Sequence, residues 1–284
     1  MARIIINADD FGLCACVNEG IIEAHRNGAL SSATIMANMP GFDQAVVLAK
    51  ENPRLGVGVH LNLVRGLPLS PASRIPTILG PDGRFLGSPS RLMRKMAAGR
   101  ARPAEVEIEL RAQIEKALAA GLRPSHVDSE KHMHAYPPVF RIAARLAGEY
   151  GIGGIRFIRE FRLSRHPVQS AKAVLLTLWS ARARAAVRSA GLVITDRFYG
   201  ICNSGRMTAA DLRRLIERPG RGSAEIMIHP GYVRPELFAL EALTGPYYIN
   251  RFREGELKAV TDPSVRALFR PGGPELTTYH GLRK

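Results

Sequence analysis

Short apolar runs alternate with amphipathic stretches along this chain of 284 residues. Runs such as Ile4-Ile5-Ile6 predict strands that are buried on both faces, whereas apolar residues three or four positions apart predict helices. The predicted strands cover residues 3–8, 32–38, 55–63, 126–134, 154–158 and a segment that ends at 229. The predicted helices cover residues 17–27, 44–50, 104–120, 137–150, 171–188, 209–217 and 246–258.

This order of elements is typical of an α/β fold in which helices cover a parallel sheet. The length is sufficient for one barrel-sized domain or two small ones. Two segments interrupt the pattern. Residues 64–102 are rich in proline, glycine and basic residues, and we expect them to lie over the mouth of a site. Residues 160–192 form a basic insertion.

The richest group of chemically active side chains lies at residues 128–134, with the sequence Asp-Ser-Glu-Lys-His-Met-His. Successive side chains of a strand alternate between its two faces, so an extended segment would direct four of them to one side. These four are Asp128, Glu130, His132 and His134. Such a cluster of carboxylates and imidazoles is seldom purely structural, and it can bind a metal or transfer protons.

Other predicted strands end in comparable residues. Asp9 and Asp10 follow the three isoleucines, His60 and Asn62 close the third strand, and His229 ends a later one. The carboxyl ends of parallel strands are where α/β proteins build active sites, so these residues predict a metal-dependent hydrolase. Asp9 and Asp10 can divide the work, because one carboxylate can hold a metal while the other accepts a proton from water. Alternatively, the pair caps the next helix.

The histidines and Asn62 have alternative interpretations. A single strand histidine such as His60 is more often structural than a ligand. Asn62 shares the face of His60 and could orient a substrate or a water molecule. His229 precedes Pro230-Gly231, a position suited to a general acid, whereas His126 is expected to lie too deep for catalysis.

The charge and the cysteine content indicate which partners and which cellular compartment to expect. The chain has 40 Lys+Arg against 25 Asp+Glu, a net charge of +15, which would attract nucleic acid, anionic lipid or acidic substrates. Its three cysteines, Cys14, Cys16 and Cys202, are too few for a disulfide framework. We interpret Cys14 and Cys16 as small buried residues. The sequence shows no signal segment and no apolar run of about 18 residues, so we expect a cytoplasmic protein.

The predicted helix at residues 171–188 has two interpretations. Its apolar residues cluster on one side, together with the chain's only tryptophan, and arginines follow. This pattern is typical of a helix that lies on a membrane surface, with Leu178, Trp179 and Arg182 facing the lipid. Alternatively, Val174, Leu175 and Leu178 pack into the core and the arginines are solvated.

Four motifs occur in order along the chain: residues 7–12, residues 58–61, residues 126–129 with His132 and His134, and residues 229–231. In these motifs and in their order, the chain resembles the YdjC-like carbohydrate deacetylases. The resemblance extends over nearly the whole chain. It implies one distorted, TIM-like β/α barrel of about seven strands over residues 1–284, with a helical insertion at about 160–192. It also implies removal of the acetyl group from an N-acetylated sugar and one divalent metal ion, Zn²⁺ or Mg²⁺.

The resemblance also implies roles for individual residues. The family's metal ligands match Asp10 and His60, and its base matches Asp9. The third family ligand is a histidine, and Glu130 occupies that position here. Glutamate can still ligate as an oxygen donor, with His132 and His134 as alternative metal or substrate contacts. Apart from the resemblance, we expect His229 to act as the acid and Arg197 or a backbone N–H to stabilise the oxyanion.

The Asp-Ser-Glu-Lys-His pattern and the basic insertion look most like the hopanoid-biosynthesis-associated branch, which implies an N-acetylglucosaminyl hopanoid as substrate. The expected partners are an N-acetylated glycan or glycolipid and the anionic inner face of the membrane. Nucleic acid is not expected, because the arginines are scattered and no stacking platform is evident. The oligomeric state is left open, a homodimer included. Alternatives are a deacetylase of soluble chitooligosaccharides and a metal-dependent phosphoesterase.

Overall fold

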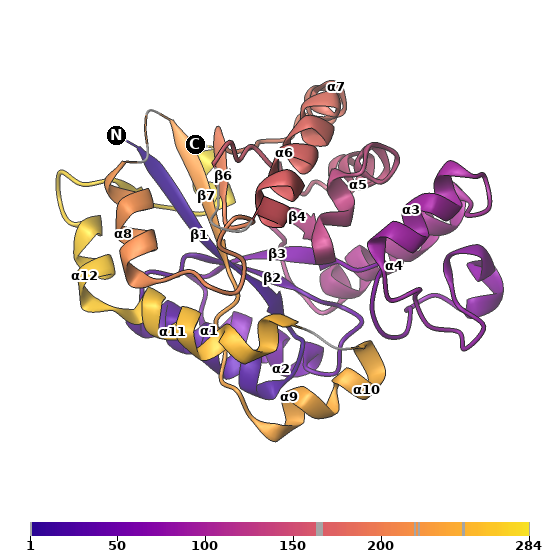
Figure 1. Ribbon diagram of the computed structural model, residues 1–284, viewed down its shortest axis with the longest axis horizontal. Helices are drawn as coiled ribbons and strands as arrows, with labels where there is room; N and C mark the ends of the chain where they lie inside the picture. Colours follow the sequence, from indigo (N-terminus) through magenta and orange to yellow (C-terminus); the bar gives the residue numbers. More distant parts are fainter. Residues whose placement is uncertain (1, 163–166, 219, 221, 246–247, 284) are drawn as a thin grey trace.

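A parallel sheet forms the centre of the fold. The computed structural model describes residues 2–162, 167–218, 220, 222–245 and 248–283. Its strands are β1 (Arg3–Phe11), β2 (Ser32–Ile35), β3 (Gly56–Leu61), β4 (His126–Ser129), β5 (Gly154–Ile155), β6 (Arg197–Tyr199), β7 (Ser223–Ile228) and β8 (Glu275–Leu276). The strand order is β5-β4-β3-β2-β1-β7-β6, and the short β8 pairs with the first residues of β1. The sheet curls into a half-barrel, which confirms the expected TIM-like α/β fold (Figure 1).

Helices surround this sheet (Figure 1). They are α1 (Ala15–Asn27), α2 (Phe42–Glu51), α3 (Pro89–Ala97), α4 (Pro103–Ala119), α5 (Pro137–Glu149), α6 (Pro167–Arg182), α7 (Arg184–Ser189), α8 (Ala209–Glu217), α9 (Pro235–Ala239), α10 (Glu241–Thr244), α11 (Arg253–Thr261), α12 (Pro263–Arg266) and α13 (Tyr279–Leu282). None of the helices in the described ranges is both long and apolar enough to span a bilayer.

The two faces of β1 have different environments. Ile4, Ile6 and Ala8 pack into the main hydrophobic core under the helices. Ile5 and Asp9 face the inside of the half-barrel, where Ile5 contacts Tyr279 and Asp9 belongs to a charged network. The alternation of a regular strand therefore separates an apolar outer layer from a polar interior.

β1 is irregular at its carboxyl end. Its register with β2 shifts between Ala8 and Phe11, and Asp10 adopts the left-handed conformation with a φ of 70°. A bulge of this kind redirects the side chain of a strand residue. Two consecutive residues, Asp9 and Asp10, can therefore both point towards the carboxyl edge of the sheet.

The prediction of a strand through residue 134 is wrong. β4 ends at Ser129, and residues Glu130–Ala135 form a 3-10 helix in which Lys131 and His132 have φ values of 52° and 58°. The Ser129 hydroxyl accepts a hydrogen bond from the backbone N–H of His134 at 2.7 Å, which closes this turn. The four polar side chains consequently do not form one strand face.

The predicted helix at residues 171–188 is two helices, α6 and α7, separated at Ala183. Val174, Leu175 and Leu178 are 40%, 45% and 50% exposed, so the alternative that packs them into the core is wrong. Leu176 and the small residues Ala173 and Ser180 face the core instead. Part of the insertion, residues 163–166, lies outside the described residues.

Two further segments differ from the sequence prediction. Residues 64–102 contain α3, which the fading periodicity did not reveal. In the predicted helix 246–258, residues 246 and 247 lie outside the described residues. The helix α11 begins only at Arg253, after a 3-10 turn.

His126 provides a test of this buried interior. Its ring stacks on Tyr279 with centroids 4.0 Å apart, and burial lowers its pKa to about 3, against about 6.5 in an unfolded chain. The folded state therefore holds the neutral ring. The stability contributed by this group is complete above pH ~6.5 and decreases as the pH falls towards 3.

When the pH falls from 7 to 5, the wild type should lose about 2 kcal/mol of unfolding free energy through His126. The variant His126→Phe retains a stacked ring but cannot be protonated, so we expect this part of the loss to be absent. Urea denaturation at both pH values measures this difference. Leu67→Phe, at an exposed position without a titratable group, is the control and should leave the loss unchanged. Equal losses in the wild type and His126→Phe would contradict the assignment.

Candidate functional site

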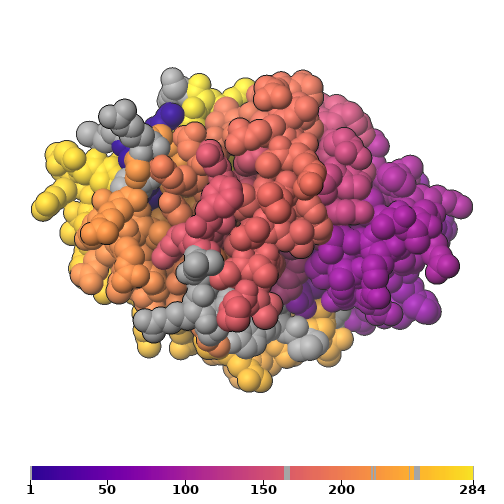
Figure 2. Space-filling model, turned by 45° about the horizontal axis from the view of Figure 1, so that its top comes forward, coloured from indigo at the N-terminus to yellow at the C-terminus, as the bar shows by residue number. Residues whose placement is uncertain are grey.

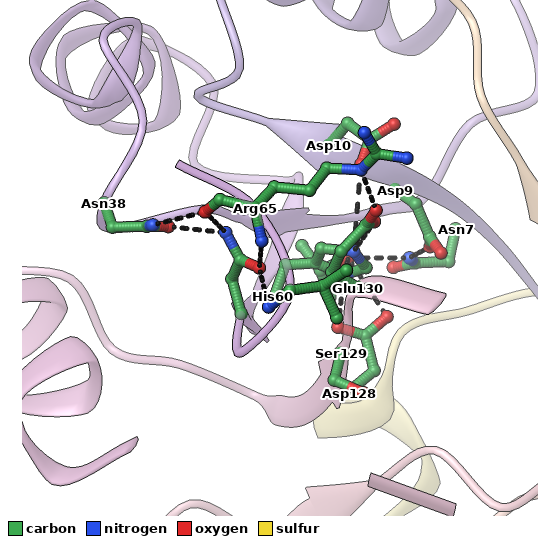
Figure 3. A network of polar contacts seen from close by, with 12 residues as sticks. Asn7, Asp9, Asp10, Asn38, His60, Arg65, Asp128, Ser129 and Glu130 are labelled. Atoms are coloured by element: carbon green, nitrogen blue, oxygen red, sulfur yellow. Dashed lines mark hydrogen bonds and ion pairs between the residues drawn. The ribbon is translucent and has the colours of Figure 1, made fainter. Parts of the chain in front are cut away.

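Three side chains converge at the carboxyl ends of β1, β3 and β4 (Figure 3). The Nε2 atom of His60 lies 3.8 Å from Asp10 Oδ1 and 3.7 Å from Glu130 Oε2. One potential ligand atom from each residue lies within 4.8 Å of the other two. All three residues are about 1% exposed. Two carboxylates and an imidazole at this spacing are a donor set suited to a divalent ion such as Zn²⁺.

His60 is oriented by the neighbouring strand. β3 and β4 pair so that His60 lies opposite Asp128. The Nδ1 atom of His60 is 2.7 Å from Asp128 Oδ1, and Asp128 also accepts a hydrogen bond from Thr34. A carboxylate on one ring nitrogen fixes the tautomer that leaves the other nitrogen available to a metal. Asp128 therefore positions His60 rather than joining the triad.

Arginines hold the carboxylates. Arg253 donates to Asp10 Oδ2 at 2.6 Å, and Arg65 donates through Nε to Glu130 Oε1 at 2.6 Å. In each case the ion pair uses one carboxylate oxygen, while the other oxygen faces His60. The arginines thus orient both carboxylates towards one point.

Arg156 organises the layer beneath this triad. It is fully buried, and its guanidinium contacts Asp9 at 2.6 Å, Asp128 at 2.6 Å and Glu225 at 2.8 Å. Glu225 in turn accepts a hydrogen bond from the Tyr279 hydroxyl at 2.6 Å. One cation therefore joins residues from β1, β4 and β7.

The charges of this network favour a divalent cation. Five carboxylates contact three arginines, so the carboxylates outnumber the guanidinium groups paired with them. Burial lowers the pKa of His60, but the carboxylates of Asp128 and Glu130 raise it well above its usual range. Burial raises the pKa of Asp10, but the charges of Arg253, His229 and His60 together outweigh it, so that this pKa is lowered. The cluster thus attracts positive charge at the position between Asp10, His60 and Glu130.

His229 comes to the same edge of the sheet as Asp9. β1 and β7 pair with Ala8 opposite Ile228, so the next residues, Asp9 in β1 and His229 just after β7, lie at the same edge of the sheet. His229 is 4% exposed, and its backbone N–H donates to Glu256. Its Nδ1 atom lies 3.5 Å from a Glu256 oxygen and makes no hydrogen bond among the described residues.

The other predicted site residues have different places. Asn62 does not face the triad, because its side chain bonds the backbone of residues 64 and 65 and thereby shapes the turn that presents Arg65. His134 contacts the Ser129 hydroxyl through Nδ1, and His132 packs edge-on against Phe198. Within the described part of the chain, neither belongs to a group of residues spaced for a metal.

Arg197 is not brought to this cluster. It pairs with Ala224, near the amino-terminal end of β7, whereas the triad lies at the opposite edge of the sheet. Ala224 pairs in turn with Ile4, five positions before Asp9. The structure therefore does not support Arg197 as a substrate contact.

Sequence reasoning missed the three arginines. Arg156 directly follows a short buried strand, a position that places a side chain at the edge where the acidic residues were expected. Arg65 follows β3 by only a few residues. Arg253 gives no local signal, because it reaches Asp10 from a helix 243 positions away along the chain.

Comparisons with known proteins extend these observations. The family model described as YdjC-like protein matches residues 3–270. A protein of Geobacillus stearothermophilus named carbohydrate deacetylase is 36% identical over 99% of this chain and 98% of its own length. A protein of Yersinia enterocolitica named chitooligosaccharide deacetylase is 34% identical over 86% of this chain and 91% of its own. A crystal structure of an Enterococcus faecalis protein, 25% identical, superposes with a TM-score of 0.77 over 99% of this chain and 98% of its own.

The buried arginine gives a direct test of the network. Arg156→Met would leave three buried carboxylates without their cation, so we expect a loss of about 3–5 kcal/mol in unfolding free energy. Arg159→Met is the matched control, since Arg159 is exposed, and its effect should stay within about 0.5 kcal/mol. Denaturant unfolding measures both, and similar small effects would show that Arg156 does not hold the site together.

Proposed function

Because this chain belongs to the YdjC-like protein family, we propose that it is a carbohydrate deacetylase that hydrolyses the acetyl amide of an N-acetylated amino sugar. The observation that supports a metal-dependent reaction is the buried triad of Asp10, His60 and Glu130, with ligand atoms within 4.8 Å of one another. A divalent ion there would supply Lewis acidity towards the acetyl carbonyl and lower the pKa of a water molecule.

Asp9 is the proposed base. Its carboxylate is fixed by two hydrogen bonds from Arg156 and one from Asn7, at distances between 2.6 and 3.0 Å. A carboxylate offers about four lone-pair directions, so Asp9 retains one for the proton of the attacking water. Arg156 therefore acts as a positioning residue for the base.

His229 is the proposed acid. The expelled sugar nitrogen must gain a proton, and His229 lies just after the strand beside Asp9. Glu256, 3.5 Å from its Nδ1 atom, can stabilise the protonated ring until the proton is transferred. Base and acid thus act from neighbouring strands on the two sides of one amide bond.

Glu130 is the proposed third ligand. The neighbouring histidines, His132 and His134, lie outside the groups spaced for a metal among the described residues, whereas Glu130 directs Oε2 towards His60. With Glu130, the site has two carboxylate ligands and one imidazole. A site with a histidine in place of Glu130 would have one carboxylate and two imidazoles. The additional oxygen ligand favours harder ions such as Mg²⁺.

The substrate that we favour is a glycolipid, an N-acetylglucosaminyl hopanoid. Its support is an exposed apolar strip on α6, which we define as Val168, Val174, Leu175 and Leu178, with exposures between 40% and 78%. Exposed arginines 182, 184 and 188 follow on α6 and α7, which form part of the face seen in Figure 2. Such a surface suits peripheral contact with an anionic membrane. The name of the Yersinia enterocolitica relative supports soluble chitooligosaccharides as the alternative substrate.

The predicted membrane contacts on α6 differ in their roles. Leu178 is half exposed and Arg182 is exposed, as a lipid-facing position requires. Trp179 is partly buried, and its ring packs against Tyr136 with centroids 5.5 Å apart. We therefore assign the membrane contact to the aliphatic residues of the strip, and Trp179 to anchoring α6 on the fold.

Acetate release tests the reaction. With Zn²⁺ or Mg²⁺ restored, the wild type should release acetate from N-acetylglucosaminyl lipid or chitooligosaccharides, and Asp9→Asn should lower kcat by about 10²–10⁴-fold while retaining the ion. Asp10→Asn should lose ion and activity together. Asp43→Asn, at an exposed site on α2, is the control. Phosphate release, or activity that persists without any metal, would overturn the proposal.

Vesicle binding tests the apolar strip. We expect Leu175→Ser with Leu178→Ser to weaken binding to anionic vesicles by at least about tenfold, because two half-exposed leucines lose their apolar burial in lipid. Hydrolysis of a soluble N-acetylated sugar should stay unchanged. Val47→Ser on α2, which is 55% exposed, is the matched control. Equal binding by all three proteins would remove the membrane contact from the proposal.

A further inference from the structure

A second group of potential metal ligands lies at the start of α1, away from the triad. Cys14 precedes the helix and Cys16 lies in its first turn, and their Sγ atoms are 3.4 Å apart. Cys14 is 7% exposed and Cys16 is fully buried. Both are free thiols. The carboxylate of Glu236, from the neighbouring α9, completes a group whose ligand atoms all lie within 4.8 Å of one another.

We propose that Cys14, Cys16 and Glu236 form a binding site for a thiophilic metal ion such as Zn²⁺, Cd²⁺ or Cu⁺, distinct from the ion site at Asp10, His60 and Glu130. Thiolate donors select these softer ions, whereas the triad offers only oxygen and nitrogen. The chain would therefore hold two ions of different chemistry.

The spacing of the two sulfur atoms fits one shared ion. Two thiolates bound tetrahedrally to one zinc ion at about 2.3 Å are about 3.8 Å apart. The distance of 3.4 Å in the structure differs from this value by only a few tenths of an ångström. A small rotation of either side chain would thus accommodate the ion without movement of the backbone.

The third ligand is held in place and leaves a route to solvent. Glu236 Oε1 accepts a hydrogen bond from the Cys16 backbone N–H at 2.8 Å, which fixes the carboxylate beside the thiols. The Glu236 side chain is exposed, although Cys16 is buried. An ion can enter from this side, and a water molecule can complete a four-coordinate site.

The two thiols differ in how readily they lose a proton. The hydrogen bond with Cys16 lowers the pKa of the Cys14 thiol, whereas the hydrogen bond with Cys14 and burial raise the pKa of the Cys16 thiol. The second proton would therefore be released only when the ion binds. Both cysteines also lie at the amino-terminal end of a 13-residue helix, where the helix dipole stabilises negative charge.

The position suggests what the ion would do. Cys14 follows Asp9, the proposed base, by five residues. The Cys16 carbonyl accepts a hydrogen bond from the backbone N–H of Tyr232, three residues after His229. An ion bound to both thiols and to α9, which contacts α1, would brace the segments that follow the proposed base and the proposed acid.

Cadmium titration of the reduced, metal-free protein tests this site, because Cd²⁺ bound to thiolates gives a characteristic ultraviolet charge-transfer band. The wild type should bind two Cd²⁺ and show the band for one. Cys14→Ser and Cys16→Ser should each lose the band and one equivalent of Cd²⁺, and Glu236→Gln should weaken that equivalent by about tenfold. Cys202→Ser is the matched control: this third cysteine donates its S–H to the Arg162 carbonyl and should leave the band unchanged.

Further controls separate this site from the proposed catalytic one. Asp10→Asn should lose the other equivalent and retain the band, so failure of either site is visible independently of the other. Because Glu236 is exposed, Glu236→Gln remains informative if a cysteine variant does not fold. A wild type without the band, or a band that survives in Cys14→Ser and Cys16→Ser, would overturn the proposal.

Discussion

The buried guanidinium of Arg156 is the interaction on which the site depends. It lies inside the half-barrel with no exposed surface and contacts carboxylates from β1, β4 and β7. Burying a charge is costly unless it is paired, and here one cation is paired three times. The arrangement makes the positions of Asp9 and Asp128 mutually dependent. Asp128 in turn fixes His60, so the geometry of the proposed metal site is determined one layer below it.

The network also explains how closely placed acidic residues can have different roles. Arg156 holds Asp9, Arg253 holds Asp10 and Arg65 holds Glu130. Asp10 and Glu130 each direct an oxygen towards His60 Nε2. The five carboxylates of the cluster outnumber its three arginines, which favours a cation at the position that Asp10 and Glu130 face. The arginine that each carboxylate contacts thus determines its proposed role: Asp9 is the base, and Asp10 and Glu130 are the metal ligands.

The sequence predicts those parts of this site that depend on local order along the chain. Acidic residues and histidines after buried strands place Asp9, Asp10, His60 and His229 at one edge of a parallel sheet, because all its strands point the same way. The bulge at Asp10 and the left-handed turn at Lys131 and His132 break the strand alternation that the sequence analysis assumed. Neither follows from periodicity, since each depends on tertiary contacts. The ion pair between Asp10 and Arg253 joins distant segments and has no local signature.

Anomalous diffraction from crystals soaked with Mn²⁺ or Zn²⁺ tests the central claim most directly, because it locates an ion without reference to activity. The account predicts one peak within about 2.0–2.2 Å of Asp10 Oδ1, His60 Nε2 and Glu130 Oε2. With Zn²⁺, a second peak is expected between Cys14, Cys16 and Glu236. A peak coordinated by His132 or His134, or no peak at the triad at saturating metal, would contradict the assignment of Glu130 and the proposed chemistry built on it.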